Sequence, residues 1–189
     1  NIMYHAPGGS TRMTSGAAGV IFYNNTILSE TSAGSSANAH WRNNLMLGEN
    51  SAPAIFSVTT NTNYSSSDYN GFRPNPGAAT AFQWNSPPRG VIAEYGALLT
   101  NYAPEGGANR APRGPSPLET RSYKSLTEYV QATGQDQHSV LVDYDVFVNV
   151  PPLDAKDVQR VQKLYRAEDL DFRLKPGSAA VDRGVALPN

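Results

Sequence analysis

A histidine and an arginine two residues apart are the most chemically suggestive pair in this chain. His40 and Arg42 lie in a strand-like segment, in which alternate side chains point to the same face. At about 3.3 Å per residue, the two side chains protrude side by side and roughly 7 Å apart. Tyr23 and Asn61 each lie 19 residues from Arg42, one before it and one after it. The spacing predicts that these four side chains share one exposed patch.

Such a patch suits β-elimination on a uronic-acid polymer. That reaction needs a cation or amide that neutralises a carboxylate and a base that takes the weakly acidic proton beside it. Arg42 and Asn61 fit the first role, and His40 or Tyr23 fits the second. The plainer alternative is that these polar side chains only cover the solvent face of a sheet.

Four other residues are candidates for binding a sugar polymer. Asp68, Tyr69 and Arg73 cluster where regular segments give way to an irregular one, and they either line a groove or anchor a turn. Trp84 lies beside a Ser-Pro-Pro sequence, where it either stacks on a sugar ring or packs against the rest of the protein.

We expect no cofactor. Four aspartates, Asp143, Asp145, Asp169 and Asp171, are close in sequence and leave calcium possible, but their spacing matches no EF-hand loop. The chain has no cysteine, which excludes a disulfide scaffold, a thiolate metal site and a cysteine nucleophile.

The elements that position these residues repeat about every 19 residues. Asn25, Asn44 and Asn63 are equally spaced, and similar residues surround them. A strand-rich repeat of this length predicts the coils of a parallel β-solenoid. Stacked coils lie ~4.8 Å apart, so the three amides are predicted to form a hydrogen-bonded ladder.

Alternation within the repeats predicts which side chains are buried. The predicted interior columns are Val20, Ala39 and Val58, and beside them Phe22, Trp41 and Thr60. The predicted outward columns are Ile21, His40 and Thr59, and beside them Tyr23, Arg42 and Asn61.

The chain is expected to form one domain, 1–189, in three parts. These are regular coils over 1–72, a long proline-rich insertion over 73–137 with a strand at 91–95, and a closing segment over 138–189. Ser125 and Glu128 form a capping box that predicts a short helix ending at Gly134. A second short helix is expected over 155–166.

The composition agrees with a turn-rich, all-β protein. Hydrophobic residues make up 39% of the 189 residues and charged residues 16%, and Gly, Pro, Asn, Ser and Thr fill the difference. A net charge of −1 gives no sign of nucleic-acid or membrane binding. No segment approaches the ~18 apolar residues that span a bilayer.

Four segments carry a family resemblance: 67–72, 134–139, 145–148 and 171–182. They resemble segments of right-handed parallel β-helix proteins of the pectate-lyase-like superfamily. The resemblance covers most of residues 19–189 and implies that fold. It also implies a secreted, extracellular enzyme that acts on a polysaccharide. Members of this superfamily usually have more coils upstream and a further closing segment, so the chain resembles the C-terminal portion of a longer protein.

The leading functional hypothesis is therefore a polysaccharide lyase. The alternatives are a non-catalytic module that binds glycans or assembles into a structure, and a glycoside hydrolase. A hydrolase needs two carboxylates about 5–9 Å apart, and the spacing of Glu30, Glu49 and Asp68 pairs none of them. The expected partners are the polysaccharide and either upstream coils or a second copy, since an open solenoid end leaves strand edges unpaired.

Overall fold

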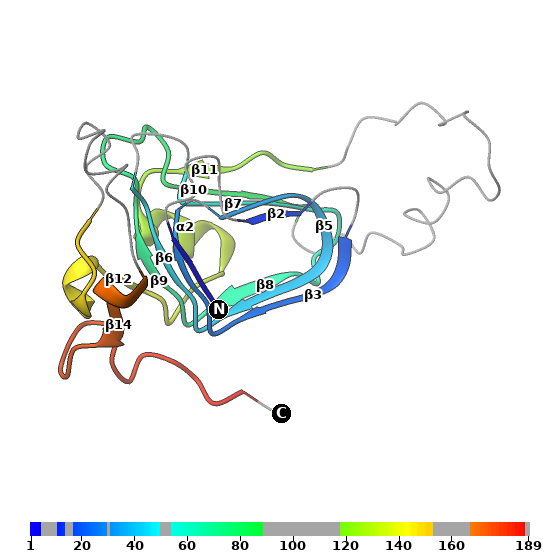
Figure 1. Cartoon of the computed structure of the whole chain (residues 1–189). Coiled ribbons are helices and arrows are strands. Elements are labelled where there is room, and N and C mark those ends of the chain that lie inside the picture. Colours follow the sequence, from blue (N-terminus) through cyan, green and yellow to red (C-terminus); the bar gives the residue numbers. More distant parts are fainter. Residues whose placement is uncertain are drawn as a thin grey trace.

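The computed structural model of the chain describes residues 1–4, 11–13, 17–29, 31–49, 54–88, 118–152 and 167–187. Figure 1 shows the main strands of these segments arranged around a common interior. The strand predicted at 91–95, the helix predicted over 155–166 and Glu30 lie outside the described residues. No described helix is both long enough and apolar enough to cross a membrane.

The first sheet contains five parallel strands. In spatial order they are β1 (Ile2–Tyr4), β4 (Thr26–Leu28), β6 (Leu45–Leu47), β9 (Gly71–Arg73) and β12 (Val140–Leu141). Each strand adds to the sheet in the order in which it occurs in the chain, so the chain returns repeatedly to the same side of the interior.

The second sheet mixes parallel and antiparallel pairs. Its spatial order is β11 (Ser122–Tyr123), β10 (Phe82–Asn85), β7 (Phe56–Thr60), β5 (Thr31–Arg42) and β2 (Thr11–Met13), with β3 (Ala17–Tyr23) and β8 (Ser66–Asp68) also paired to β5. The β10–β11 pair is antiparallel and the others are parallel. At 12 residues β5 is long enough to pair with four other strands.

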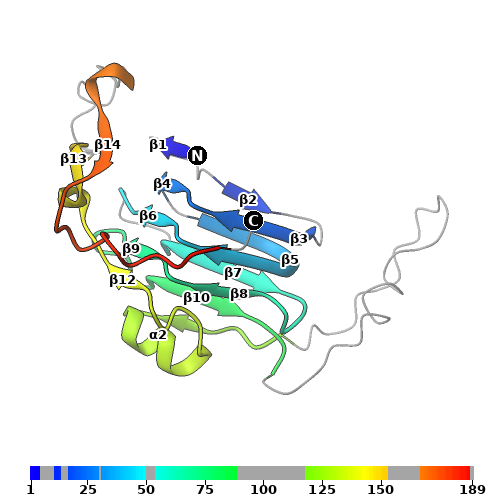
Figure 2. The same ribbon diagram turned by 90° about the horizontal axis from the view of Figure 1, so that it is seen from below.

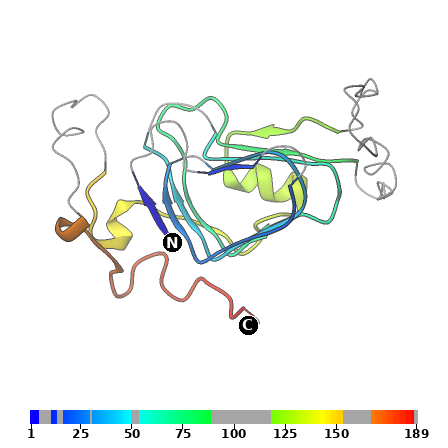
Figure 3. The same ribbon diagram turned by 45° about the vertical axis from the view of Figure 1, so that its right-hand side comes forward.

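A third, separate sheet is antiparallel and contains β13 (Phe147–Asn149) and β14 (Asp171–Leu174). Figure 3 shows this pair at the side of the first sheet, outside the interior that the other strands surround. Three short one-turn or two-turn helices complete the described elements: α2 (Leu126–Thr133), η1 (Tyr144–Val146) and η2 (Ala167–Asp169).

The prediction of a single right-handed parallel β-helix is therefore wrong. The strands form several sheets, and two of these contain antiparallel pairs. The physical reason is that the spacing of 19 residues does not persist. Paired strands farther along the chain are separated by other intervals, and β11 and β14 run antiparallel to their partners. A coil of constant length therefore does not describe the whole chain.

The spacing of 19 residues does hold between β3 and β5. Val20 pairs with Ala39, Phe22 with Trp41 and Tyr23 with Arg42, as the sequence predicts. The third predicted repeat is out of register, because Val58 pairs with Ala33 and Thr60 with Ser36. The strand beside His40–Arg42 is instead β8, which pairs Ser66 with His40 and Asp68 with Arg42.

The predicted asparagine ladder exists, but its third member is Asn70 and not Asn63. The Nδ2 of Asn25 donates to Oδ1 of Asn44 at 2.9 Å, and the Nδ2 of Asn44 donates to Oδ1 of Asn70 at 2.9 Å. Asn63 is exposed and donates to the carbonyl of Pro88. A residue with left-handed backbone precedes each ladder member: Asn24 (φ 56°), Asn43 (φ 56°) and Tyr69 (φ 57°).

The ladder ends on a buried carboxyl group. Asn70 donates from Nδ2 to Oδ1 of Asp136 at 3.0 Å, Ser139 donates to the same oxygen at 2.6 Å, and the Tyr129 hydroxyl donates to Oδ2 at 3.1 Å. Asp136 is 1% exposed. Burial raises the pKa of Asp136, although its hydrogen bonds oppose that shift. This carboxyl group thus joins the ladder to α2.

The helix α2 closes one end of the interior, as Figure 2 shows. Its predicted boundaries are confirmed: Ser125 and Glu128 form the capping box, and Gly134 ends the helix with φ 70°. Tyr129 is fully buried and stacks on Phe82 with ring centroids 5.1 Å apart. Beneath it the core continues through the buried rings of Trp84, Phe72, Phe56 and Trp41.

Candidate functional site

The outward side of β3, β5 and β8 carries most of the reactive side chains that the sequence singles out. The register places Ile21, His40 and Ser66 in one row and Tyr23, Arg42 and Asp68 in the next. Rows of this kind repeat about every 4.8 Å across a sheet. We call the surface formed by Tyr23, His40, Arg42, Ser66, Asp68, Tyr69 and His138 the β5 face.

Asp68 holds His138 in one orientation on the β5 face. Its Oδ2 lies 2.8 Å from Nδ1 of His138, while its Oδ1 accepts from the backbone N–H groups of His138 (2.8 Å) and Tyr69 (2.9 Å). A carboxylate accepts, so Nδ1 carries a proton, and in the neutral imidazole Nε2 holds the lone pair. The His138 side chain is 57% exposed. The imidazole is therefore accessible to a solute.

Partial burial raises the pKa of Asp68, but the hydrogen bonds from His138 and Tyr69 outweigh it and hold that pKa below 3.8. The Asp68 carboxylate thus contributes stability above this pH, and the contribution is lost as the pH falls below 3.8 through the folded-state value.

We therefore expect acid unfolding to distinguish two variants. Below pH 3.8, the wild-type midpoint temperature should fall more steeply than that of Asp68→Asn. Thermal melts followed by circular dichroism between pH 2 and 6 measure this. Asp145→Asn, at an exposed position, should behave as the wild type does. Equal slopes for all three proteins would contradict the assignment.

Tyr69 forms a platform next to this pair. Its ring stacks on the His138 imidazole, with centroids 4.6 Å apart and planes at 8°. Tyr69 has a positive φ of 57°, which turns the chain sharply after β8 and places the ring against His138. The stack and the Asp68 hydrogen bond together fix the imidazole.

His40 is held through both ring nitrogens. Nε2 lies 2.9 Å from Oδ1 of Asn38, and Nδ1 lies 2.8 Å from Oγ of Ser66. Burial, assisted by the positive charge of Arg42, lowers the pKa of His40 below 6.5. The imidazole is accordingly neutral at pH 7, but its lone pair is directed at Ser66.

Arg42 supplies a positive charge in the middle of the β5 face. Its guanidinium donates to the carbonyl of Trp41 (2.8 Å) and to Oγ of Ser66 (2.9 Å). Among the residues that the structure describes, no carboxylate forms an ion pair with Arg42. The fixed cation is therefore able to bind an anionic solute.

The structure brings Tyr23, His40, Arg42, Asp68 and Tyr69 together, and it places three other predicted site residues elsewhere. Asn61 follows β7, and its backbone N–H donates to the carbonyl of Ser36. The expectation that Asn61 lies beside Arg42 is wrong, because Asp68 occupies that position. Trp84 is 3% exposed and packs within the core, and so does not present its ring to a solute.

Arg73 fastens the first sheet to the segment after β12. Its Nε donates to Oδ1 of Asp143 at 2.6 Å, and its guanidinium lies over the Tyr144 ring, 5.1 Å from the centroid. The Tyr144 hydroxyl donates to Glu49 at 2.9 Å. Burial, followed by the charge of Glu49, raises the pKa of Tyr144. This cluster stabilises the fold and contributes nothing to the β5 face.

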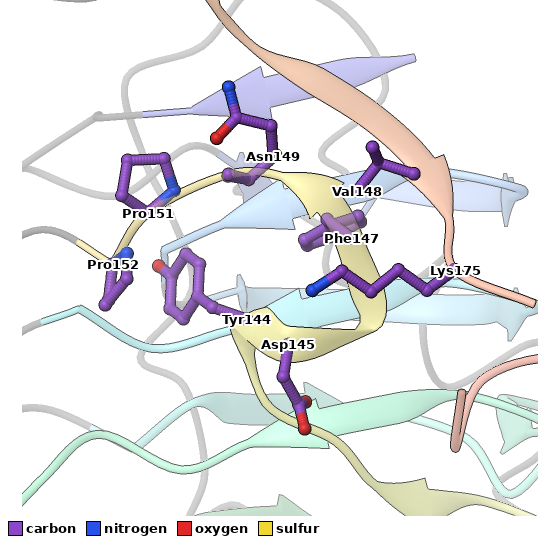
Figure 4. Close-up of a pocket in the computed structure, with 9 residues that line it drawn as sticks. Tyr144, Asp145, Phe147, Val148, Asn149, Pro151, Pro152 and Lys175 are labelled. Carbon is purple, nitrogen blue, oxygen red and sulfur yellow. The ribbon is translucent and has the colours of Figure 1, made fainter. Parts of the chain in front are cut away.

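A shallow hollow of about 250 Å³ lies near β13 and contains no residue of the β5 face. Figure 4 shows Lys175 and Asp145 among the labelled side chains around it, together with two prolines. In the described part of the chain, no group of three or more His, Asp or Glu residues is arranged to hold a metal ion.

Sequence reasoning missed three residues of this region: Ser66, His138 and Asn38. His138 is 70 residues from Asp68, so no local pattern links them. Ser66 appears in the sequence as one of three consecutive serines. The only available signal was the Asn38-x-His40 spacing, which allows an amide to reach back to the imidazole.

Comparisons with known proteins return no relative. No protein-family model, curated protein or solved structure matches this chain.

Proposed function

We propose that the β5 face acts on a uronic-acid polysaccharide by β-elimination, in a secreted protein. The observation that carries the proposal is the cation of Arg42, which forms no ion pair within the described part of the chain and lies between two groups suited to proton transfer. Tyr23 lies in the row on one side of Arg42, and Asp68 with its attached His138 lies on the other.

The reaction uses these groups in sequence. The guanidinium of Arg42 pairs with the sugar carboxylate and stabilises the negative charge that develops beside it. Nε2 of His138 takes the proton from the carbon next to the carboxylate. The carbon–oxygen bond to the neighbouring sugar then breaks, and Tyr23 is positioned to give its phenolic proton to the leaving oxygen. One product ends in a hydroxyl group at the cleaved bond, and the other is an unsaturated uronate with a new carbon–carbon double bond.

In this proposal the group that accepts the proton is His138, and not His40 or Tyr23. The sequence offers His40 or Tyr23, but the lone pair of His40 is directed at Ser66, whereas His138 contacts Asp68 through Nδ1 and its side chain is 57% exposed. The arrangement also disfavours a hydrolase. Asp68 is the one carboxylate of the β5 face, and its low pKa makes it a poor general acid.

An assay of three signals tests the proposal. The wild-type protein is incubated with a panel of uronate polymers, and ultraviolet absorbance from unsaturated ends, new reducing ends and binding are measured. Elimination gives the first two signals together. Reducing ends without absorbance would assign hydrolysis instead, and binding with neither signal would assign a non-catalytic module.

Arg42→Ala should lower the elimination rate by about 100-fold or more, since it removes the group that neutralises the carboxylate. The matched control is Arg173→Ala, because Arg173 is 82% exposed and pairs with Asp171 on β14. The control should keep the wild-type rate. Equal rates for the two variants would remove Arg42 from the mechanism.

We also propose that the edges of β1, β2 and β3 join a second copy of the chain. Among the described residues, β1 pairs only with β4, and β2 and β3 pair only with β5. Their outer N–H and C=O groups are therefore open to pairing. Ile2 and Ile21 on these strands are 50% and 62% exposed.

Self-association through these edges predicts a concentration-dependent dimer. Sedimentation equilibrium should show the dimer for the wild type and a shift toward monomer for Ile21→Lys, because charge on an edge strand opposes pairing. Leu174→Lys, on β14, is the control and should dimerise as the wild type does. A wild-type protein that stays monomeric at every concentration would contradict this proposal.

A further inference from the structure

The Ser66 hydroxyl on β8 lies between a base and a cation. Its Oγ is 2.8 Å from Nδ1 of His40 and 2.9 Å from NH2 of Arg42. Ser66 is half-buried, and its side chain is on the outward side of β8. The elimination proposed above does not use this serine.

The hydrogen bonds fix the direction of proton sharing. Oδ1 of Asn38 can only accept, so the Nε2 of His40 carries the imidazole proton. Nδ1 is then the acceptor and takes a hydrogen bond from the Ser66 hydroxyl. Arg42 can only donate, so its guanidinium points a proton at the same serine oxygen. Ser66 thus donates to a neutral base and accepts from a cation.

The backbone helps to build this arrangement. Asn38 has a left-handed φ of 56°, a conformation that asparagine adopts more readily than most residues. It turns its amide back onto the residue two places along the same strand. Burial and the charge of Arg42 lower the pKa of His40, so the imidazole is free to take a proton near neutral pH.

A second serine at an outward strand position, Ser57, shows that the contacts of Ser66 are unusual. Ser57 on β7 is also half-buried, but its hydroxyl donates to Oε1 of Gln83 at 2.8 Å. An amide oxygen neither removes a proton nor stabilises an alkoxide. Ser57 is therefore a matched serine without an activating base or cation.

We infer that Ser66 is an activated nucleophile that attacks carboxylic esters, with His40 as its general base and Asn38 as the residue that positions His40. The constellation of nucleophile, base and orienting group is the general pattern of serine acyl transfer. Arg42 lies close enough to Oγ to stabilise an oxyanion on the carbon that Oγ attacks. An anionic ester is the favoured substrate class, because Arg42 attracts it.

The step balances without any further reagent. Oγ of Ser66 forms a bond to the ester carbonyl carbon as its proton moves to Nδ1 of His40. The carbon–oxygen bond to the alcohol breaks, and the alcohol leaves with the proton from His40. Water, deprotonated by His40, then hydrolyses the acyl-serine to the free acid and regenerates the hydroxyl.

Covalent labelling tests the inference independently of any polysaccharide. The intact protein is treated with a fluorophosphonate, and peptide mass spectrometry measures the rate of modification at each serine. Ser66 should be labelled at least about tenfold faster than Ser57, and His40→Gln should slow labelling of Ser66 by about 100-fold. Ser57→Ala should leave the Ser66 rate unchanged.

A second variant separates a positioning role from a structural one. Asn38→Asp keeps the acceptor and tolerates the positive φ, but its charge stabilises the imidazolium. The pH midpoint of Ser66 labelling should therefore shift upward by about one unit or more, while circular dichroism stays native. Labelling of Ser66 at the Ser57 rate, or an unshifted midpoint in folded Asn38→Asp, would overturn the inference. Labelling does not require elimination, so this experiment tests the role of Ser66 whether or not the protein is a lyase.

Discussion

Asp136→Leu is expected to lower the free energy of unfolding by about 3 kcal/mol or more. The Asp136 carboxyl group accepts hydrogen bonds from the side chains of Asn70, Ser139 and Tyr129, among others. Each buried donor that loses its acceptor costs about 1–3 kcal/mol. Leucine also disfavours the left-handed φ of 54° at this position.

Urea unfolding at pH 7 measures the loss. The matched control is Asp136→Asn, which keeps one acceptor oxygen and tolerates the backbone conformation. It should lose less than half as much stability as Asp136→Leu. If the two variants were equally stable, the carboxyl group would not be the junction between the asparagine ladder and α2.

The second large effect is expected on catalysis. His138→Gln should reduce kcat/KM for elimination by about 10²- to 10⁴-fold, the range that a positioned general base contributes. Glutamine can still donate to Asp68, so the fold around β8 should survive. The glutamine amide, however, is far too weak a base to accept the proton that Nε2 of His138 accepts.

Gln137→Ala serves as the neighbouring control, because that side chain is exposed and, among the described residues, bonds only to the carbonyl of Gly134. It should retain the wild-type kcat/KM. Retention of full elimination activity in His138→Gln would show that the base is another group, and Tyr23 would then be the next to test.

Local sequence patterns predict the secondary structure of this chain most dependably. The capping box at Ser125 and the glycine at 134 define α2 through contacts within a few residues, and the structure confirms both. The register of β3 against β5 was also predictable, because the chain returns after 19 residues with a closely matching sequence.

The repeat failed at the point where the spacing changed. Asn63 lies at the expected interval, but residues 61–65 form a turn and a short irregular stretch, so the chain reaches the ladder position only at Asn70, 26 residues after Asn44. The extra seven residues replace Asn61 with Asp68 beside Arg42. Composition cannot reveal such a change, since both asparagines suit a turn.

The candidate site could be predicted only in part for the same reason. His40, Arg42 and Tyr23 depend on the register that held, and they do share a face. His138 lies 70 residues from Asp68 in the sequence. Its contact with Asp68 can be predicted only if the turn before β12 is known to lie beside β8 and β9. For Trp84 the sequence leaves two alternatives open, stacking on a sugar ring or packing against the protein, and the structure shows the second, because the ring is part of the core.

Both proposals for the β5 face depend on β8 lying beside the end of β5. Since the chain has no cysteine, a designed pair reports this directly. The structure pairs Arg42 with Asp68, and neighbouring strands bring Cα atoms within the range of about 4.4–6.8 Å that a disulfide spans. Mild oxidation of the double variant Arg42→Cys, Asp68→Cys should form an intramolecular disulfide in the folded protein, as intact mass and thiol counting would show. Rapid disulfide formation in Arg42→Cys, Asn61→Cys, and none in the first pair, would contradict the register and both proposals with it.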